Sequence, residues 1–175
     1  MKLNIGARTR AEGWHTFDIV PGPEVDFVGD CRDLAQFAAN SVDTIYASHV
    51  LEHVRYATEL APTLKRWFLV LKPGGMLMIC VPDLRTLCHL FLHPKAQMGD
   101  RFQIMRMMFG GQMDPHDLHY VGFDFEILGQ YLFDAGFREI RKVEDFKLFR
   151  DTSLQQFAGV PISLNVSAQK PAGAA

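Results

Sequence analysis

The sequence predicts an α/β fold, in which helices cover both faces of a mostly parallel sheet. Short apolar runs rich in β-branched residues recur along the chain, and each ends at glycine, proline, aspartate or a small polar residue. Longer stretches whose apolar residues have helical spacing separate the later runs. Such alternation is typical of parallel strands joined by helices that pack on the sheet.

Five apolar runs are expected to form the first strands of the sheet. They are "KLNI" (2–5), "TFDIV" (16–20), "VDFVGD" (25–30), "VDTIYAS" (42–48) and "GMLMICVP" (75–82). Gly6 and Asp18, at the ends of the first two, are only twelve positions apart. A parallel crossover normally spends about that many residues on its helix alone. The first crossover helix is therefore expected to be short or absent.

Two helices are expected later in the chain. The first precedes Pro73-Gly74-Gly75 and has an apolar face of Leu60, Leu64, Trp67, Phe68 and Leu71, with Pro62 tolerable because it lies near the first turn. The second is apolar at Phe125, Leu128 and Leu132. A strand is expected from about Phe137, and "ISLNVSAQ" (162–169) follows as a last strand able to pair antiparallel.

Composition limits the classes of protein to which the chain can belong. With 175 residues, 48% of them hydrophobic, it is long enough for one well-cored domain, expected over residues 1–170, with 171–175 as a disordered tail. A net charge of −2 argues against nucleic-acid partners. No apolar stretch is long enough to span a membrane, and Cys31, Cys80 and Cys88 lack metal spacing. We expect a cytoplasmic protein with no metal site.

Residues where the strands stop are the candidates for ligand binding, because ligands of open α/β sheets bind beyond the carboxyl ends of the strands. In order these are Gly6-Ala7, Asp18, Asp30-Cys31, Ser48-His49 and Pro82-Asp83. A glycine turn followed by an acid at the end of the next strand suits a ribose. The alternatives are a turn aspartate at Asp18 and a helix cap for "CRDLAQF" at Asp30.

The order of these segments resembles the class I S-adenosylmethionine-dependent methyltransferases. The resemblance rests on "LNIGA", "EGW", "FDI", "GDCRDL", "DTIYASHVLEHV" and "LKPGGMLMICVPD", in that order. More narrowly, the chain is similar to a small bacterial branch of predicted, type 11-like methyltransferases, which "GGQMDPHDLHYVGFD" and "LFDAGF" also match. The resemblance implies a Rossmann-like seven-stranded sheet with a reversed last strand and S-adenosylmethionine over the ends of the first, second and fourth strands.

Carried over residue by residue, the resemblance implies roles for the strand-end residues. Gly6 and Ala7 would face the amino-acid part of the cofactor, and Asp18 would bind its ribose. Asp30 and Cys31 would face the adenine, while Ser48 and His49 would line the floor near the sulfonium. Residues 84–123 would form a lid on the acceptor side.

Arg8 departs from the family pattern, because it stands where the second glycine of "G-x-G" is expected. A left-handed backbone at a non-glycine residue costs roughly 1–2 kcal/mol, and a blocked amide contact adds about one more. Together these predict a roughly ten- to hundredfold weaker cofactor site. Arg8 can also point to solvent, or pair with the cofactor carboxylate, so three alternatives stay open.

Histidine is the natural general base for an acceptor hydroxyl or amine. His49 and His53 in "SHVLEHV" follow the fourth strand and are the catalytic candidates, with capping and helix packing as the structural alternative. His116 and His119 in "DPHDLHY" are second candidates, more typical of an exposed loop. "HDLH" superficially suggests a metal pair, but no third ligand is spaced to complete it.

A methionine-rich segment follows the fifth strand. Phe102, Met105, Met108 and Phe109 would share one helical face, which is more typical of packing than of binding, although a pliable lid or an interface stays open.

The leading hypothesis is a methyltransferase that uses S-adenosylmethionine and acts on a small or carrier-linked metabolite. The alternative is a degenerate methyltransferase fold retained for binding or assembly, because of Arg8. A nicotinamide oxidoreductase is disfavoured, since G-x-G-x-x-G before a helix is lacking. Self-association as a homodimer is left open.

Overall fold

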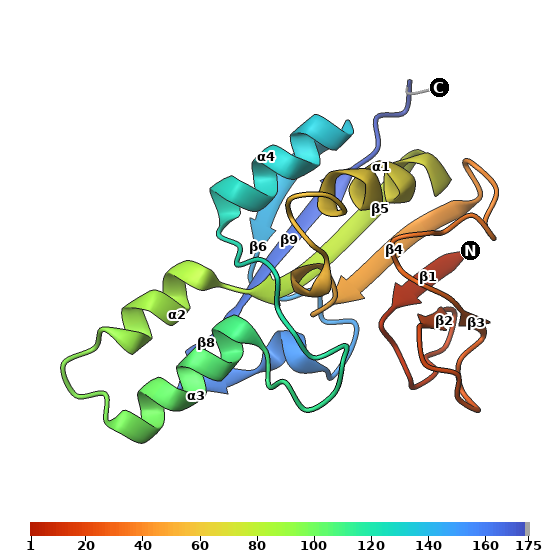
Figure 1. Cartoon of the computed structure of the whole chain (residues 1–175). Helices are drawn as coiled ribbons and strands as arrows, with labels where there is room; N and C mark the ends of the chain where they lie inside the picture. Colours follow the sequence, from red (N-terminus) through yellow and green to blue (C-terminus); the bar gives the residue numbers. More distant parts are fainter. Residues whose placement is uncertain (174–175) are drawn as a thin grey trace.

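The computed structural model describes residues 1–173 and contains one seven-stranded sheet with helices packed against it (Figure 1). The strands are β1 (Lys2–Ile5), β2 (His15–Asp18), β3 (Phe27–Val28), β4 (Val42–Ser48), β5 (Leu71–Pro82), β6 (Arg138–Val143), β7 (Gln156–Phe157), β8 (Val160–Pro161) and β9 (Ser163–Gln169). The helices are η1 (Leu51–His53), α1 (Leu60–Val70), α2 (Leu84–Phe91), α3 (Met98–Phe109), α4 (Phe125–Ala135) and η2 (Thr152–Leu154).

The strand order of the main sheet is β3-β2-β1-β4-β5-β9-β6. Neighbouring strands from β3 to β5 pair in parallel, whereas β9 runs antiparallel to both β5 and β6. The predicted α/β fold with a reversed last strand is confirmed. β7 and β8 form a separate two-stranded pair.

The first crossover has no helix, as the short interval predicted. Residues 6–14, all within the described chain, form turns. The second and third runs are shorter strands than expected: β2 ends at Asp18, and Ile19 and Val20 are 41% and 37% exposed. The expectation that Ile19 and Val20 belong to a buried strand is wrong. The neighbouring edge strand β3 pairs with β2 at only two positions, Phe17 and Asp18, so the chain beyond Asp18 is not part of the sheet.

The two faces of the sheet are covered by different means. Figure 1 shows α1 and α4 on one face, where they pack beside each other over β5 and β9. On the opposite face Tyr46 of β4 is 1% exposed, and its ring contacts Phe146 and Phe149 from the loop before η2. Trp14 packs edge-on against Tyr46 as well. Aromatic side chains from loops thus bury this part of the sheet, where the sequence analysis expected helices.

The helix ends follow local sequence signals. α1 ends at Val70, and Leu71 begins β5. The expectation that Leu71 belongs to the helix is therefore wrong. Asp83 caps α2 by accepting from the backbone of Arg85 and Thr86. α4 ends at Gly136, whose φ of 108° is a left-handed conformation suited to glycine.

Residues 84–123 leave the sheet as α2 and α3, which project to one side of the molecule in Figure 1. Ile104 is the buried residue of α3 and packs with Leu87 of α2 and Ile162. The expected packing holds for Met108, which is partly buried against this cluster, but is wrong for Phe102, Met105 and Phe109, which are 52%, 37% and 56% exposed. α3 packs through Ile104, Met107 and Met108, and these three exposed side chains lie away from that cluster.

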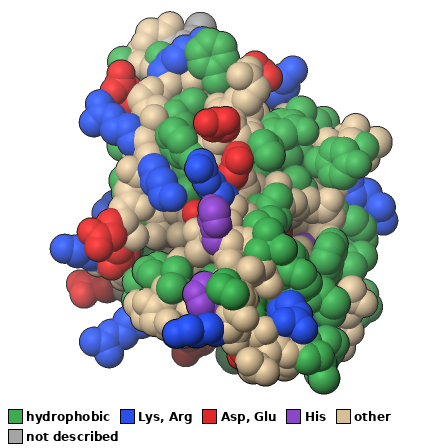
Figure 2. Space-filling model, turned by 90° about the vertical axis from the view of Figure 1, so that its left-hand side faces the viewer, with side chains coloured by type: hydrophobic (Ala, Val, Ile, Leu, Met, Phe, Trp, Pro, Cys, Tyr) green, Lys and Arg blue, Asp and Glu red, His purple; other side chains and the backbone are tan. Residues whose placement is uncertain are grey.

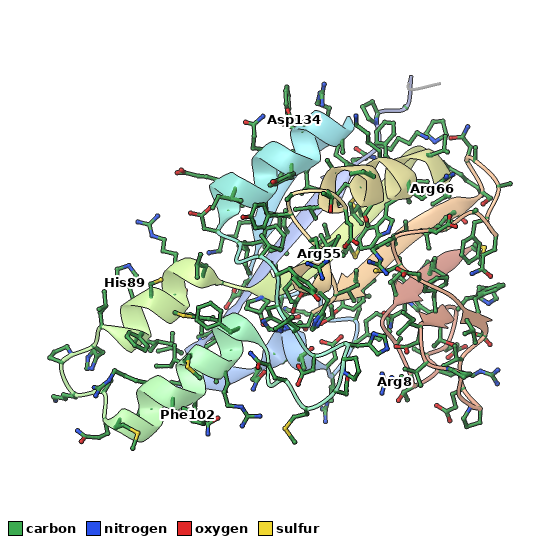
Figure 3. All side chains as sticks on the ribbon, viewed as in Figure 1. Arg8, Arg55, Arg66, His89, Phe102 and Asp134 are labelled. Carbon is green, nitrogen blue, oxygen red and sulfur yellow. The ribbon has the colours of Figure 1, made fainter. Side chains whose placement is uncertain are left out.

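Hydrophobic side chains are exposed on this projecting segment, and Figure 2 shows groups of hydrophobic side chains on this face of the molecule, with charged side chains between and beside them. Figure 3 places Phe102 on the side of α3 that faces away from α2. Whether the segment acts as a lid stays a prediction.

No helix within residues 1–173 combines the length and the apolar character needed to cross a membrane.

Candidate active site

The carboxyl ends of β1, β2 and β4 meet at one edge of the sheet and enclose a cavity of about 350 Å³. Parallel strands end at a common edge, which is why residues far apart in sequence converge there. Predicted site residues line the cavity: Gly6, Asp18, Asp30, Cys31, His49 and His53.

Gly6 closes one wall of this cavity in a conformation that excludes other residues. Its φ is +81°, and its amide donates to the carbonyl of Phe17 at 2.8 Å. A Cβ at this position would lie 2.6 Å from the Cγ2 atom of Val50. The backbone of β1 can therefore approach a ligand closely here only because residue 6 is glycine.

Asp18 presents a buried carboxylate at the end of β2. The residue is 5% exposed, and its Oδ1 atom accepts the amide of Val20 at 2.7 Å. The Nε atom of Arg8 lies 3.4 Å from the same oxygen. Among residues 1–173, no hydrogen bond reaches the Oδ2 atom of Asp18, which leaves this oxygen available to a ligand hydroxyl.

Arg8 lies in the loop after β1, where Figure 3 labels it, and its side chain is 64% exposed. The expected left-handed strain does not arise: positive φ in this loop falls on Gly6 and Gly13, and Arg8 is not among the described residues with positive φ. Without a first crossover helix, the loop turns at these two glycines instead. The mostly exposed side chain borders the cavity, and its Nε atom pairs with Asp18.

Asp30 is held by a neighbouring guanidinium rather than left open. Both carboxylate oxygens accept from Arg32, whose NH1 group also donates to Glu59 at 2.7 Å. Hydrogen bonds from Arg32 hold the pKa of Asp30 below its usual range. The helix-cap alternative is wrong, because residues 31–37 form turns. Nearby, the indole of Trp67 donates to the carbonyl of Cys31 at 2.7 Å and fixes this segment.

Ala7 and Ser48 lie on a second cavity of about 390 Å³ beside the first, with Gly6 and Arg8 shared between the two. The Oγ atom of Ser48 is 3.3 Å from the Oγ1 atom of Thr152. The fold thus divides the predicted cofactor-binding set: Ala7 and Ser48 line only the second cavity, Asp18, Asp30 and Cys31 line only the first, and Gly6 lines both.

His49 follows β4 with a φ of +54°, a backbone conformation that is uncommon outside glycine but that histidine adopts more often than most residues. Its Nε2 atom is 3.0 Å from the Oγ atom of Ser163, and its Nδ1 atom is 3.2 Å from the Oε1 atom of Glu52. Glu52 is 1% exposed. Burial alone would raise the pKa of Glu52, but neighbouring histidines, above all His49, lower it overall.

His53 and His119 stack in an edge-to-face arrangement with ring centroids 4.8 Å apart. The expectation of an exposed loop holds for His116 but is wrong for His119, which is partly buried. Burial lowers the pKa of His119 and favours the neutral ring. Sequence reasoning missed Glu52 altogether, since its only signal is an acid in an otherwise apolar turn.

Of the three cysteines, Cys88 is expected to react first with a thiol reagent. It is exposed on α2, whereas burial raises the pKa of Cys31 and of Cys80 to about 12. We expect one fast-reacting thiol per native chain at neutral pH, three after denaturation, and no fast phase in Cys88→Ser. A fast phase that persists in this variant would contradict the expected burial.

Residues 6–79 match a family described as a methyltransferase domain. No curated protein matches the sequence. Among solved structures, a SAM dependent methyltransferase from Archaeoglobus fulgidus is similar with a TM-score of 0.60 and 16% identity, over 97% of this chain and 85% of the other.

Two further structures are similar over 97% of this chain. The Burkholderia thailandensis 1,6-didemethyltoxoflavin-N1-methyltransferase, solved with 1,6-didemethyltoxoflavin and S-adenosylhomocysteine, has a TM-score of 0.58 and 18% identity, with 70% of its chain covered. A protein from Bordetella parapertussis has a TM-score of 0.59 and 14% identity. This chain spans only 61% of its length. The resemblance to class I methyltransferases is confirmed, and the fold is theirs.

Proposed function

We propose that this chain, which has the class I methyltransferase fold and matches a methyltransferase-domain family over residues 6–79, is a methyltransferase that uses S-adenosylmethionine. The acceptor is a small or carrier-linked metabolite. One observation carries the proposal: a glycine with no room for a side chain and a buried carboxylate, Asp18, converge on one cavity at the strand ends.

The residues around this cavity fit the cofactor. The close approach of the backbone at Gly6 suits the amino-acid part, and the Oδ2 atom of Asp18 suits a ribose hydroxyl. The bound cofactor would supply an electrophilic methyl group. The chain's own contribution is to orient the cofactor and the acceptor, which is a large part of catalysis in a displacement of this kind.

His49 is the proposed base for an acceptor that must lose a proton. It lines the cavity, and the carboxylate of Glu52 lies behind its Nδ1 atom, which is the arrangement that orients an imidazole and stabilises its protonated form. His53 also lines the cavity and is the second candidate.

Calorimetric titration of the native chain with S-adenosylmethionine and then S-adenosylhomocysteine tests the proposal. We expect one site with micromolar affinity for both. Absence of binding to the folded chain would contradict it, and would leave the fold as a scaffold for binding or assembly.

Arg8 gives that alternative its specific support, because its Nε atom lies beside the carboxylate that the ribose is proposed to use. We expect the effect to be small: Arg8→Ala should change the affinity for S-adenosylhomocysteine by less than about tenfold. The reason is that an exposed ion pair is worth about 0–1 kcal/mol and the backbone at Arg8 has no left-handed strain to relieve.

The matched comparison is Arg8→Gly. If the native chain binds poorly and Arg8→Gly gains far more than tenfold, Arg8 blocks the site, and the degenerate fold becomes the better account.

A further inference from the structure

Behind the wall of the cavity that Asp18 and His53 line, several imidazoles surround one buried carboxylate. Glu52 is 1% exposed, and in the described chain neither of its side-chain oxygens accepts a well-aligned hydrogen bond, although the Nδ1 atom of His49 lies 3.2 Å from its Oε1 atom. One potential ligand atom from each of Glu52, His53 and His119 lies within 4.8 Å of the other two. Burying a carboxylate that lacks well-aligned hydrogen bonds is costly, so its location favours positive charge close by.

The two histidines are held by their Nδ1 atoms. The Nδ1 atom of His53 is 3.2 Å from the carbonyl oxygen of Leu118, and that of His119 is 3.1 Å from the carbonyl oxygen of Met107. A carbonyl can only accept a hydrogen bond, so each Nδ1 carries a hydrogen, and in the neutral ring the lone pair is left on Nε2. Metal-binding histidines are typically fixed in this way, with one ring nitrogen donating to a carbonyl or carboxylate.

We propose that Glu52, His53 and His119 bind a divalent transition metal ion of the zinc type. Two imidazoles and one carboxylate are an established zinc ligand set. Ligand atoms around a tetrahedral zinc ion are about 3.3 Å apart, so the three side chains, now within 4.8 Å of one another, would draw closer around the ion. Mg²⁺ and Ca²⁺ prefer oxygen ligands, so this set disfavours them.

The fold explains why these residues meet. Glu52 and His53 belong to η1, directly after β4, and His119 comes from the segment between α3 and α4. The amide of Tyr120 donates to the carbonyl of Glu52 at 2.7 Å, which holds the two segments together. Because His53 also lines the cavity, an ion bound here lies at its wall, with a fourth position for water or an acceptor group.

Two consequences separate the metal site from the proposed methyl transfer. His53 cannot serve as the base while it ligates the ion, so His49 is left in that role. Metal binding also needs no S-adenosylmethionine, and is therefore testable whether or not the chain proves to be a methyltransferase.

The competing account is an ion-pair network in which protonated histidines, His49 among them, balance the charge of Glu52. This network needs no metal. The metal account expects tight binding of Zn²⁺ by the native chain and much weaker binding once the Glu52 charge is removed. The ion-pair account expects neither.

The test is a Zn²⁺ titration of the full chain, freed of metal by a chelator and kept free of cofactor, in competition with a chromophoric chelator. We expect one equivalent bound with a dissociation constant near or below about 1 μM, and no binding of Mg²⁺. Saturating Zn²⁺ should raise the melting temperature by about 5 °C or more. Co²⁺ should give the visible absorption of a low-coordinate nitrogen and oxygen site.

Variants locate the site. Glu52→Gln keeps the side-chain shape and should weaken Zn²⁺ binding at least about 100-fold, as should His119→Ala. His116→Ala, in the same loop, and His93→Ala, on the surface, should bind as the native chain does. The proposal is overturned if the native chain binds no Zn²⁺ at about 100 μM, or if Glu52→Gln binds as tightly as the native chain. The Zn²⁺ titration of the native chain tests the proposed metal site even if His119→Ala fails to fold.

Discussion

Replacing Asp18 with alanine is expected to lower the affinity for S-adenosylhomocysteine by at least about 100-fold while leaving the chain folded. The carboxylate is proposed to accept the ribose hydroxyls, and a hydrogen bond to a charged group contributes about 1.5–3 kcal/mol. Two such bonds exceed the roughly 2.8 kcal/mol that corresponds to 100-fold. The measurement is calorimetric titration of both chains.

Two controls make the Asp18 result specific to the ligand. Asp33→Ala removes a carboxylate from the same edge of the fold, but Asp33 does not line the cavity, so binding should be unchanged. Asp18→Asn keeps an acceptor oxygen and should fall between the native chain and Asp18→Ala. Circular dichroism monitors folding, since the amide of Val20 loses its acceptor. Unchanged affinity in Asp18→Ala would mean that the ribose is not held at β2.

The order and type of the main strands could be predicted because buried parallel strands have a strong local signal. In β1, Leu3, Asn4 and Ile5 are all buried, which is the continuous pattern that the sequence analysis used. Long-range packing was beyond the sequence signal. Tyr46 is covered by Phe146 and Phe149, about a hundred residues away, and no periodicity indicates such a contact.

The candidate site divides in the same way. Gly6 and Asp18 could be predicted because the sequence indicates where each strand ends, and the carboxyl ends of parallel strands meet at one edge of the sheet. Glu52 and His119 could not be joined, because they meet only after the segment beyond α3 returns to η1. The strain expected at Arg8 was wrong for a related reason: φ in a loop depends on how the whole loop closes, which the absent first helix alters.

Lys170 is a further residue whose structural role the sequence did not indicate. It follows β9 at the end of the predicted domain, yet it is 1% exposed. Its ammonium donates to the Oδ1 atom of Asn40 at 2.8 Å and to the carbonyls of Phe68 and Leu71, both at 2.9 Å. All three hydrogens of the ammonium therefore have partners, and these include two carbonyls at the junction of α1 and β5.

Lys170→Met is expected to lower the free energy of unfolding by about 3 kcal/mol, and the melting temperature by about 10 °C. The apolar replacement fills similar space but leaves three acceptors without this donor, among them the buried carbonyl of Leu71, and it also removes the charge 4.7 Å from the ring of Phe68. Thermal and urea denaturation followed by circular dichroism measure the loss.

Lys72→Met is the matched control for Lys170→Met, because the same substitution there removes an exposed ion pair with Asp43. Such pairs contribute about 0–1 kcal/mol, so the control should unfold close to the native chain. If the two variants lose equal stability, the hydrogen bonds of Lys170 contribute no more than a surface charge. A loss confined to Lys170→Met would show that the end of β9 stabilises the fold through the α1–β5 junction.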